Sequence, residues 1–107
     1  MPRGRDGRGW KQDGKITSHK FHLGKVVAAP GVLSALAAIG QSPQEFLSRH
    51  HGGDWGEVDE HDARENETSL QQGFRLLSAY TLKDGTRIWV ITEADRSSTT
   101  ILLPEEY

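Results

Sequence analysis

The dipeptide Asp84-Gly85 stands between two segments that have the composition of β-strands. Residues 74–82 are mostly apolar, and residues 88–92 consist only of β-branched and aromatic residues and threonine. Tight hairpin turns prefer Asp-Gly because their central residues need a positive φ. The sequence therefore predicts an antiparallel hairpin over residues 74–92, and the rest of the chain has to cover at least one of its faces.

Two further strands flank this hairpin in the sequence. A polar connection at residues 93–98 leads to residues 99–103, where Pro104 ends the segment because proline cannot donate to a ladder. Near the other end, residues 21–27 include β-branched and aromatic side chains and are followed by the break Ala29-Pro30-Gly31. We expect a first strand at residues 21–27 and a last strand at residues 99–103.

Three helices are expected between the first strand and the hairpin. Residues 31–39 have apolar side chains at helical spacing and stop at Gly40. Ser42, Pro43 and Glu45 have the arrangement of a capped helix start, and that helix should end at residues 50–53. Asp59 is the expected cap of a third helix that runs to Gln72, largely exposed to solvent. The order β-α-α-α-β-β-β predicts an α+β fold with a three-stranded antiparallel meander and helices packed on one face.

The length and the charge distribution divide the chain into an arm and one domain. A chain of 107 residues is the size of a single domain. Residues 1–25 hold seven basic and two acidic residues, whereas the remainder has a net charge of −7. We predict that residues 1–20 form a flexible basic arm rich in glycine and arginine, and that residues 21–107 form a single small α+β domain. The absence of cysteine and of a long apolar run favours a cytoplasmic protein that does not enter membranes.

The arm has two interpretations. It interleaves cationic side chains, glycines and one aromatic ring, as disordered segments that bind nucleic acid do. The residues that would make this contact are Arg3, Arg5, Arg8, Trp10 and Lys11. Asp6 and Asp13 interrupt the basic run, which favours the alternative of a solvated tail.

Several segments of the domain resemble a family of short bacterial proteins carried on plasmids and integrative elements. The resemblance covers residues 23–107 and rests on the segments Gly40-Gln41-Ser42-Pro43, Glu45-Phe46-Leu47, Gly53-Asp54-Trp55-Gly56, residues 73–80, residues 91–97 and residues 99–107. Members are called plasmid-related proteins or, in some cases, a restriction-enzyme subunit. The resemblance implies no activity and no catalytic residue, and the basic arm has no counterpart in it.

The segment from residue 54 to residue 67 holds seven acidic residues and one basic residue. Such a row can imitate phosphates, which suggests an inhibitor of a host defence nuclease of the anti-restriction or anti-CRISPR type. The acidic face would consist of Asp54, Glu57, Asp59, Glu60 and Asp62. The simpler interpretation is a solvated face whose acids cap helices and pair with the helix dipole.

Five histidines raise the alternatives of a metal site and of a nuclease. They are His19, His22, His50, His51 and His61, and none has the spacing of a metal-ligand motif, so we expect no metal and no cofactor. A small metal-independent ribonuclease of the toxin type would need His50 or His51 to meet Glu93, Asp95 and Arg96. The net charge of the domain is negative, which disfavours RNA binding, so we expect no catalytic residues and no enzyme.

The remaining candidate is a surface for a partner. Trp89 and Ile91 share one face of their strand, whereas Ile88 and Val90 share the other, so one apolar face needs a cover besides the helices. We expect the cover to be a protein partner or a second copy of the chain in a homodimer. The predicted contact residues are Trp55, Trp89, Ile91, Glu93, Asp95 and Arg96. The sequence is interpreted as a non-catalytic interaction module of a bacterial mobile genetic element.

Overall fold

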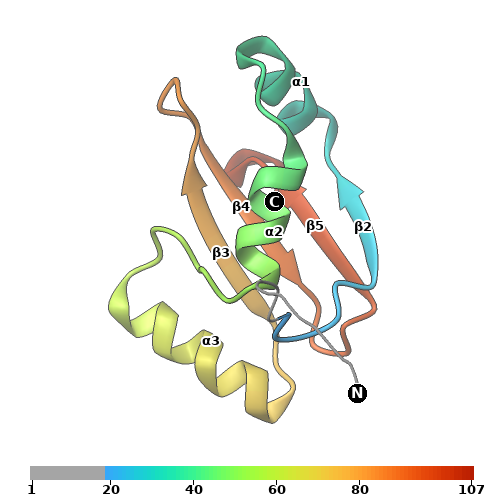
Figure 1. The fold of residues 1–107 in the computed structure, drawn as a ribbon, viewed down its shortest axis with the longest axis vertical. Coiled ribbons are helices and arrows are strands. Elements are labelled where there is room, and N and C mark those ends of the chain that lie inside the picture. The colour runs from blue at the N-terminus through green and yellow to red at the C-terminus, as the bar shows by residue number, and fades with distance from the viewer. Residues whose placement is uncertain (1–18) are drawn as a thin grey trace, which may run out of the picture.

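A computed structural model of the chain describes residues 19–107 and shows an α+β fold. The elements along the chain are strand β2 (Lys25–Ala28), helices α1 (Pro30–Ile39), α2 (Pro43–His51) and α3 (Glu60–Gln72), strands β3 (Leu76–Thr81), β4 (Arg87–Thr92) and β5 (Ser98–Leu102), and the short 3-10 helix η3 (Pro104–Glu106) (Figure 1). Residues 1–18, which make up most of the predicted basic arm and include its five candidate nucleic-acid contacts, lie outside the described residues.

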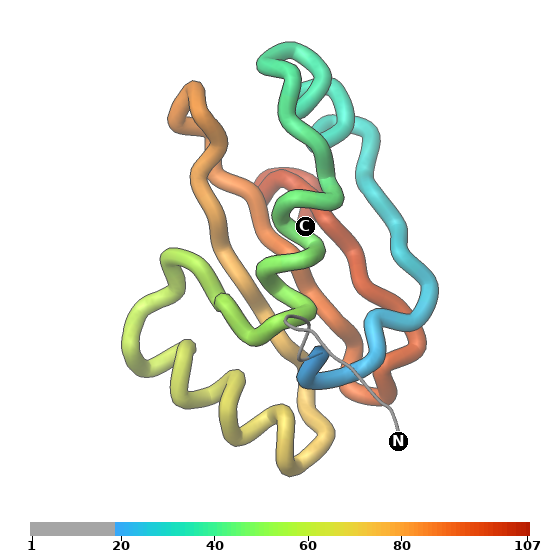
Figure 2. The backbone as a smooth tube through the Cα atoms, viewed as in Figure 1, coloured from blue at the N-terminus to red at the C-terminus, as the bar shows by residue number. Residues whose placement is uncertain are grey.

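The sheet has four strands in the order β2-β5-β4-β3. Strands β3, β4 and β5 form the expected antiparallel meander, with Ala79 opposite Trp89 and Trp89 opposite Leu102. Strand β2 adds a fourth strand that runs parallel to β5, so the sheet is mixed and larger than the predicted meander. The chain leaves β2 at one edge, passes through the helices and enters β3 at the other edge, as the tube in Figure 2 shows.

The first strand begins at residue 25 and not at residue 21, because Gly24 prevents an earlier start. Its φ of +66° lies in the left-handed region, and a side chain at this position would collide with the backbone oxygens of Arg96 and Ser97. Immediately afterwards, the Lys25 amide donates to the oxygen of Ser97, 3.0 Å away. The ladder with β5 therefore starts where the glycine allows the two backbones to meet.

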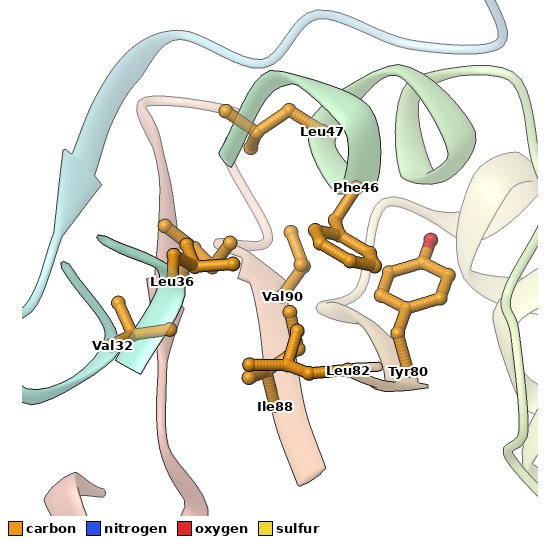
Figure 3. Close-up of a cluster of buried hydrophobic side chains, with 9 residues drawn as sticks. Val32, Leu36, Phe46, Leu47, Tyr80, Leu82, Ile88 and Val90 are labelled. Carbon is orange, nitrogen blue, oxygen red and sulfur yellow. The ribbon is translucent and has the colours of Figure 1, made fainter. Parts of the chain in front are cut away.

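Helices α1 and α2 cover one face of the sheet and enclose the core (Figure 3). The buried side chains come from both helices and from strands β3, β4 and β5. They are Val32, Leu36, Phe46, Leu47, Tyr80, Leu82, Ile88, Val90 and Ile101. Ile88 and Val90 belong to the face of β4 opposite to Trp89, as the alternation along the strand predicted.

Helix α3 contacts β3 at the side of the sheet and does not lie over its face (Figure 1). Its buried residues are the polar pair Asn66 and Ser69, whereas its apolar residues Ala63 and Leu70 are only half-buried. Asn66 accepts the backbone N–H of Leu77 at 3.0 Å and donates to the oxygen of Leu77 at 2.7 Å. A strand edge has backbone N–H and C=O groups that need hydrogen-bond partners. Helix α3 therefore places a polar side chain at this contact, where a helix packed on the core would place leucine.

Two of the three helices are capped as expected. The Ser42 hydroxyl accepts the Gln44 amide at 3.1 Å, and the Asp59 carboxylate accepts the Asp62 amide at 2.8 Å. Helix α1 has no such cap from Ala29. Its first turn is satisfied by Glu106, whose carboxylate accepts the amides of Gly31 at 2.6 Å and Val32 at 3.2 Å. The same carboxylate accepts the Leu103 amide at 2.9 Å, so it joins the last turn of the chain to the first helix.

Replacing Glu106 by alanine should lower the free energy of unfolding by about 1–2 kcal/mol, because two helix N-terminal amides lose a charged acceptor. Urea denaturation measures this loss. Glu105→Ala removes a neighbouring exposed carboxylate and should leave the unfolding midpoint unchanged. Equal destabilisation by both variants would contradict the capping role.

Candidate protein-docking surface

The face of the sheet opposite to α1 and α2 carries Trp89, and the C-terminal residue of the chain lies against it. The rings of Trp89 and Tyr107 meet edge to face, with centroids 5.8 Å apart and planes at 73°. Trp89 is half-buried as a result, whereas 69% of the Tyr107 surface stays exposed. Tyr107 therefore covers part of the predicted apolar face, and its own ring remains exposed beside Trp89.

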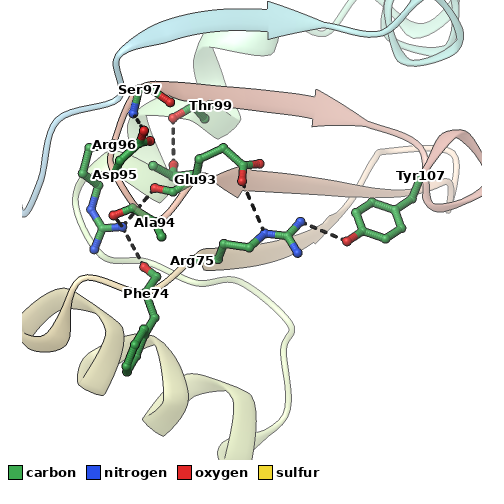
Figure 4. A network of polar contacts seen from close by, with 10 residues as sticks. Phe74, Arg75, Glu93, Ala94, Asp95, Arg96, Ser97, Thr99 and Tyr107 are labelled. Carbon is green, nitrogen blue, oxygen red and sulfur yellow. Dashed lines mark hydrogen bonds and ion pairs between the residues drawn. The ribbon is translucent and has the colours of Figure 1, made fainter.

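Arg75 connects this aromatic pair to the turn between β4 and β5 (Figure 4). Its Nη2 donates to the hydroxyl of Tyr107 at 3.0 Å, and its Nε lies 3.8 Å from Oε1 of Glu93. The guanidinium carbon also stands 5.6 Å from the centre of the Tyr107 ring. Arg75 and Glu93 are both about half exposed, so their ion pair adds little to stability. The hydrogen bond from Arg75 positions the hydroxyl of Tyr107.

A pocket of about 520 Å³ opens beside Arg75, between α3 and the β4–β5 turn. It is lined by Glu65, Thr68, Ser69, Phe74, Arg75 and Ala94. Phe74 keeps 57% of its surface exposed, although it is one of the largest apolar side chains of the domain. We refer to Phe74, Arg75, Trp89, Glu93, Ala94 and Tyr107 together as the Arg75 surface.

Arg96 holds the walls of this pocket together. Its Nη1 donates to the backbone oxygens of Phe74 at 2.7 Å, Glu93 at 3.1 Å and Ala94 at 3.1 Å, and its Nη2 donates to Ser69 at 2.9 Å. The residue has a φ of +61°, which costs a non-glycine residue roughly 1 kcal/mol or more. The carbonyl bonds offset that cost, so the pocket is formed before any ligand binds.

The six predicted contact residues do not all lie on this surface. Trp55 is buried, and its indole N–H donates to Glu67 at 2.9 Å while its ring stacks on Phe21. Ile91 is also buried. Burial removes both residues from the set that can touch a partner, because neither presents more than a small fraction of its surface.

The other four predicted residues lie on β4 or in the β4–β5 turn, and none of them lines the pocket. Glu93 pairs with Arg75, Trp89 packs on Tyr107, and Arg96 braces the backbone. Asp95 accepts the backbone amide of Ser97 at 2.9 Å, which closes the turn. Hydrogen bonds from the Ser97 hydroxyl and from this amide hold the pKa of the Asp95 carboxyl below its usual value. Sequence reasoning missed Phe74, Arg75 and Tyr107. Only the alternation that places Arg75 on the face of Leu77 and Ala79 could have indicated one of them.

The predicted acidic face does not form one continuous row. Asp54 pairs with Arg49 at 2.7 Å, which lowers the pKa of its carboxyl, and Glu57 lies 3.9 Å from the Nε of Arg87. Asp59 caps α3, Glu60 lies 3.7 Å from Arg64, and Asp62 is in the first turn of the helix. Asp59 and Asp62 thus have the capping and helix-dipole roles that the sequence suggested. Arginine side chains stand beside the other three acids, whereas a phosphate mimic needs an uninterrupted negative surface.

His50 is at the centre of a buried hydrogen-bond chain. Thr99 donates to the oxygen of Leu23 at 2.7 Å, so its hydroxyl must accept from Thr92, 2.7 Å away. Thr92 in turn accepts from Nε2 of His50 at 2.8 Å, and the opposite nitrogen, Nδ1, accepts from Ser78 at 2.6 Å. This order places a proton on Nε2 of His50, and in the neutral ring Nδ1 is then the acceptor for Ser78.

Burial also explains why His50 stays neutral. The side chain has no exposed surface, and desolvation lowers its pKa to about 3, with smaller contributions from the charges of His51 and Arg96. Phe21 lies against the His50 ring edge-on, with centroids 5.2 Å apart, and the Arg96 guanidinium carbon stands 5.8 Å from the centre of the Phe21 ring. This packing separates His50 from the turn, so His50 does not contact Glu93 or Asp95 as one form of the ribonuclease hypothesis needed.

The other histidines do not form a metal site in the part of the chain that the structure describes. The rings of His19 and His51 stack with centroids 3.8 Å apart, and Nε2 of His51 donates to the oxygen of Phe21 at 2.8 Å. Across residues 19–107, no three His, Asp or Glu side chains gather in an arrangement that could hold a metal ion. In the same residues, no helix has the length and apolar character needed to cross a membrane.

Comparisons of the chain with protein-family models, with curated proteins and with solved structures find no match.

The domain should lose stability as the pH falls below about 6.5, because the folded state keeps His50 neutral while the unfolded chain binds a proton. Stability is complete above the unfolded pKa and declines towards the folded value of about 3. Between pH 7 and pH 5 this one group should cost roughly 2 kcal/mol of unfolding free energy. Urea denaturation at both pH values measures the change.

His50→Gln should reduce that pH dependence, because glutamine cannot gain a proton. The same substitution should lower the stability at pH 7. The matched control is His61→Gln, which changes an exposed histidine of α3 and should keep the slope of the unchanged protein. An undiminished slope in His50→Gln would show that other groups carry the pH dependence.

Proposed function

We propose that the chain is a non-catalytic interaction module that binds a protein partner through the Arg75 surface. The observation that carries the proposal is the pocket between α3 and the β4–β5 turn, which is lined by the exposed Phe74 and by Arg75, the residue that also bonds the exposed Tyr107. Aromatic and arginine side chains contribute most to the affinity of protein interfaces. A protein that exposes Phe74 and Tyr107 beside a preformed pocket has such residues available without a conformational change.

The chemistry of the surface favours a protein over a nucleic acid. Arg75 already faces Glu93, and Glu65 lines the same pocket, so the surface has mixed charge. Nucleic-acid sites in contrast gather cations along the path of the phosphates. A peptide that inserts an apolar side chain next to Phe74 and places polar groups over Arg75 and Glu65 would match this distribution.

The resemblance of residues 23–107 to plasmid-borne proteins is the reason to search for the partner among bacterial proteins. It also supports our inference that the module belongs to a mobile genetic element. The two alternatives from the sequence receive no comparable support. The acidic residues are paired with basic residues or cap a helix, and His50 is enclosed by its hydrogen-bond partners and by Phe21.

Affinity capture from a bacterial lysate tests the proposal. The tagged full chain should retain one protein after nuclease treatment, and Phe74→Ala and Tyr107→Ala should each reduce the retained amount about tenfold. Both side chains are exposed, so their removal should leave the melting temperature unchanged. Mass spectrometry identifies the protein, and titration calorimetry with the purified partner measures the affinities.

Leu33→Ala is the matched control, because Leu33 is a comparably exposed apolar residue of α1, outside the Arg75 surface. It should bind like the unchanged chain. Capture that disappears on nuclease treatment would assign the binding to nucleic acid. Capture that survives both aromatic substitutions would place the contact elsewhere on the domain.

A further inference from the structure

The two edges of the sheet differ in how their backbone groups are satisfied. At the β3 edge, the Asn66 side chain bonds both the N–H and the C=O of Leu77. One step along, the Ala79 amide donates to Trp55 at 3.1 Å, and its oxygen accepts from Glu57 at 2.6 Å. Gly56 makes this approach possible, since a side chain there would collide with the oxygen of Ala79. The β3 edge is therefore closed to a further strand.

The β2 edge has no such protection from residues 19–107. Strand β2 is last in the sheet and pairs only with β5 among the described strands. The amides of Lys25 and Ala29 donate to β5, so alternation directs the N–H and C=O groups of Val26 and Ala28 away from the sheet. Val26 and Val27 are 46% and 41% exposed. Edge strands are usually protected by charge, proline or a bulge. In β2 only the first residue, Lys25, is charged, and Pro30 stands beyond its end, so Val26, Val27 and Ala28 have no such protection within the strand.

We propose that this edge pairs with β2 of a second copy of the chain, in antiparallel orientation about a two-fold axis at Val27. In this register the outward groups of Val26 meet those of Ala28 of the second copy, so every outward donor finds an acceptor. The two Val27 side chains lie directly opposite each other and bury their exposed surface. The sheet then continues through both molecules as eight strands, with the Arg75 surface at a distance from the junction.

The charge of the strand supports a second copy in this register. Lys25 is the only charged residue of β2, and the register places it opposite Ala29 and not opposite the other Lys25. Gly24 and Pro30 then mark the two ends of the paired segment in both chains. Closed two-fold pairing is also the most common form of self-association. Since the paired segment is short, the dimer should dissociate on dilution.

Sedimentation velocity of the full chain, from about 10 µM to about 1 mM, tests the pairing. The chain should change from one copy to two as the concentration rises. Val27→Lys and Val27→Glu should each remain single at every concentration, because like charges would stand directly opposite across the axis. An equimolar mixture of these two variants should recover the dimer.

Leu33→Lys is the matched control, because it adds the same charge at an equally exposed apolar position of α1 and should dimerise normally. A chain that stays single at 1 mM overturns the proposal. So does a dimer that persists in Val27→Lys, which would assign self-association to another surface, and so does a mixture that fails to recover it. Phe74→Ala and Tyr107→Ala should dimerise unchanged, which separates this test from the test of partner binding.

Discussion

The hydrogen bonds of His50 connect four separate parts of the chain, and the arrangement of the domain depends on them. Through Ser78, Thr92 and Thr99 the imidazole reaches three strands, and the Thr99 hydroxyl extends the connection to the backbone at Leu23. All of these side chains are buried, so each bond must be made for the core to close. The hydrogen bonds need a proton on Nε2, and burial lowers the pKa of His50 so that the ring stays neutral. The position of α2 over the sheet and the entry into β2 are thus decided by one uncharged histidine.

In other parts of the domain, polar side chains make hydrogen bonds to the backbone that another backbone segment usually makes. Asn66 takes the place of a neighbouring strand at Leu77, and Glu106 caps α1 by accepting the amide of Gly31, 75 residues earlier in the chain. Arg96 bonds carbonyls from three segments. Each satisfies main-chain groups that would otherwise lose hydrogen bonds on burial. The hydrogen bonds of Arg96 join the walls of the pocket beside Arg75, whereas the outward backbone groups of β2 have no partner among residues 19–107. The two places suit different contacts, one with side chains of a partner and one with a backbone.

The candidate surface was predictable only in part. Trp89 and the turn at residues 93–97 follow from strand alternation and turn chemistry, and the structure places them beside the pocket. Trp55 was predicted as a contact residue from its size alone, and size does not distinguish a buried core residue from a contact residue. Phe74 and Tyr107 were missed because they stand at the ends of elements, where no periodicity indicates which way a side chain points.

The hairpin at Asp84-Gly85, the helix caps at Ser42 and Asp59 and the α+β class could be read from the sequence, because each depends on neighbouring residues. Local preferences of this kind act within a few positions of the chain. The parallel pairing of β2 with β5, the edge position of α3 and the pocket were decided by the tertiary structure. Each joins residues far apart in the chain, and their contacts arise only when burial forces distant polar groups to satisfy one another.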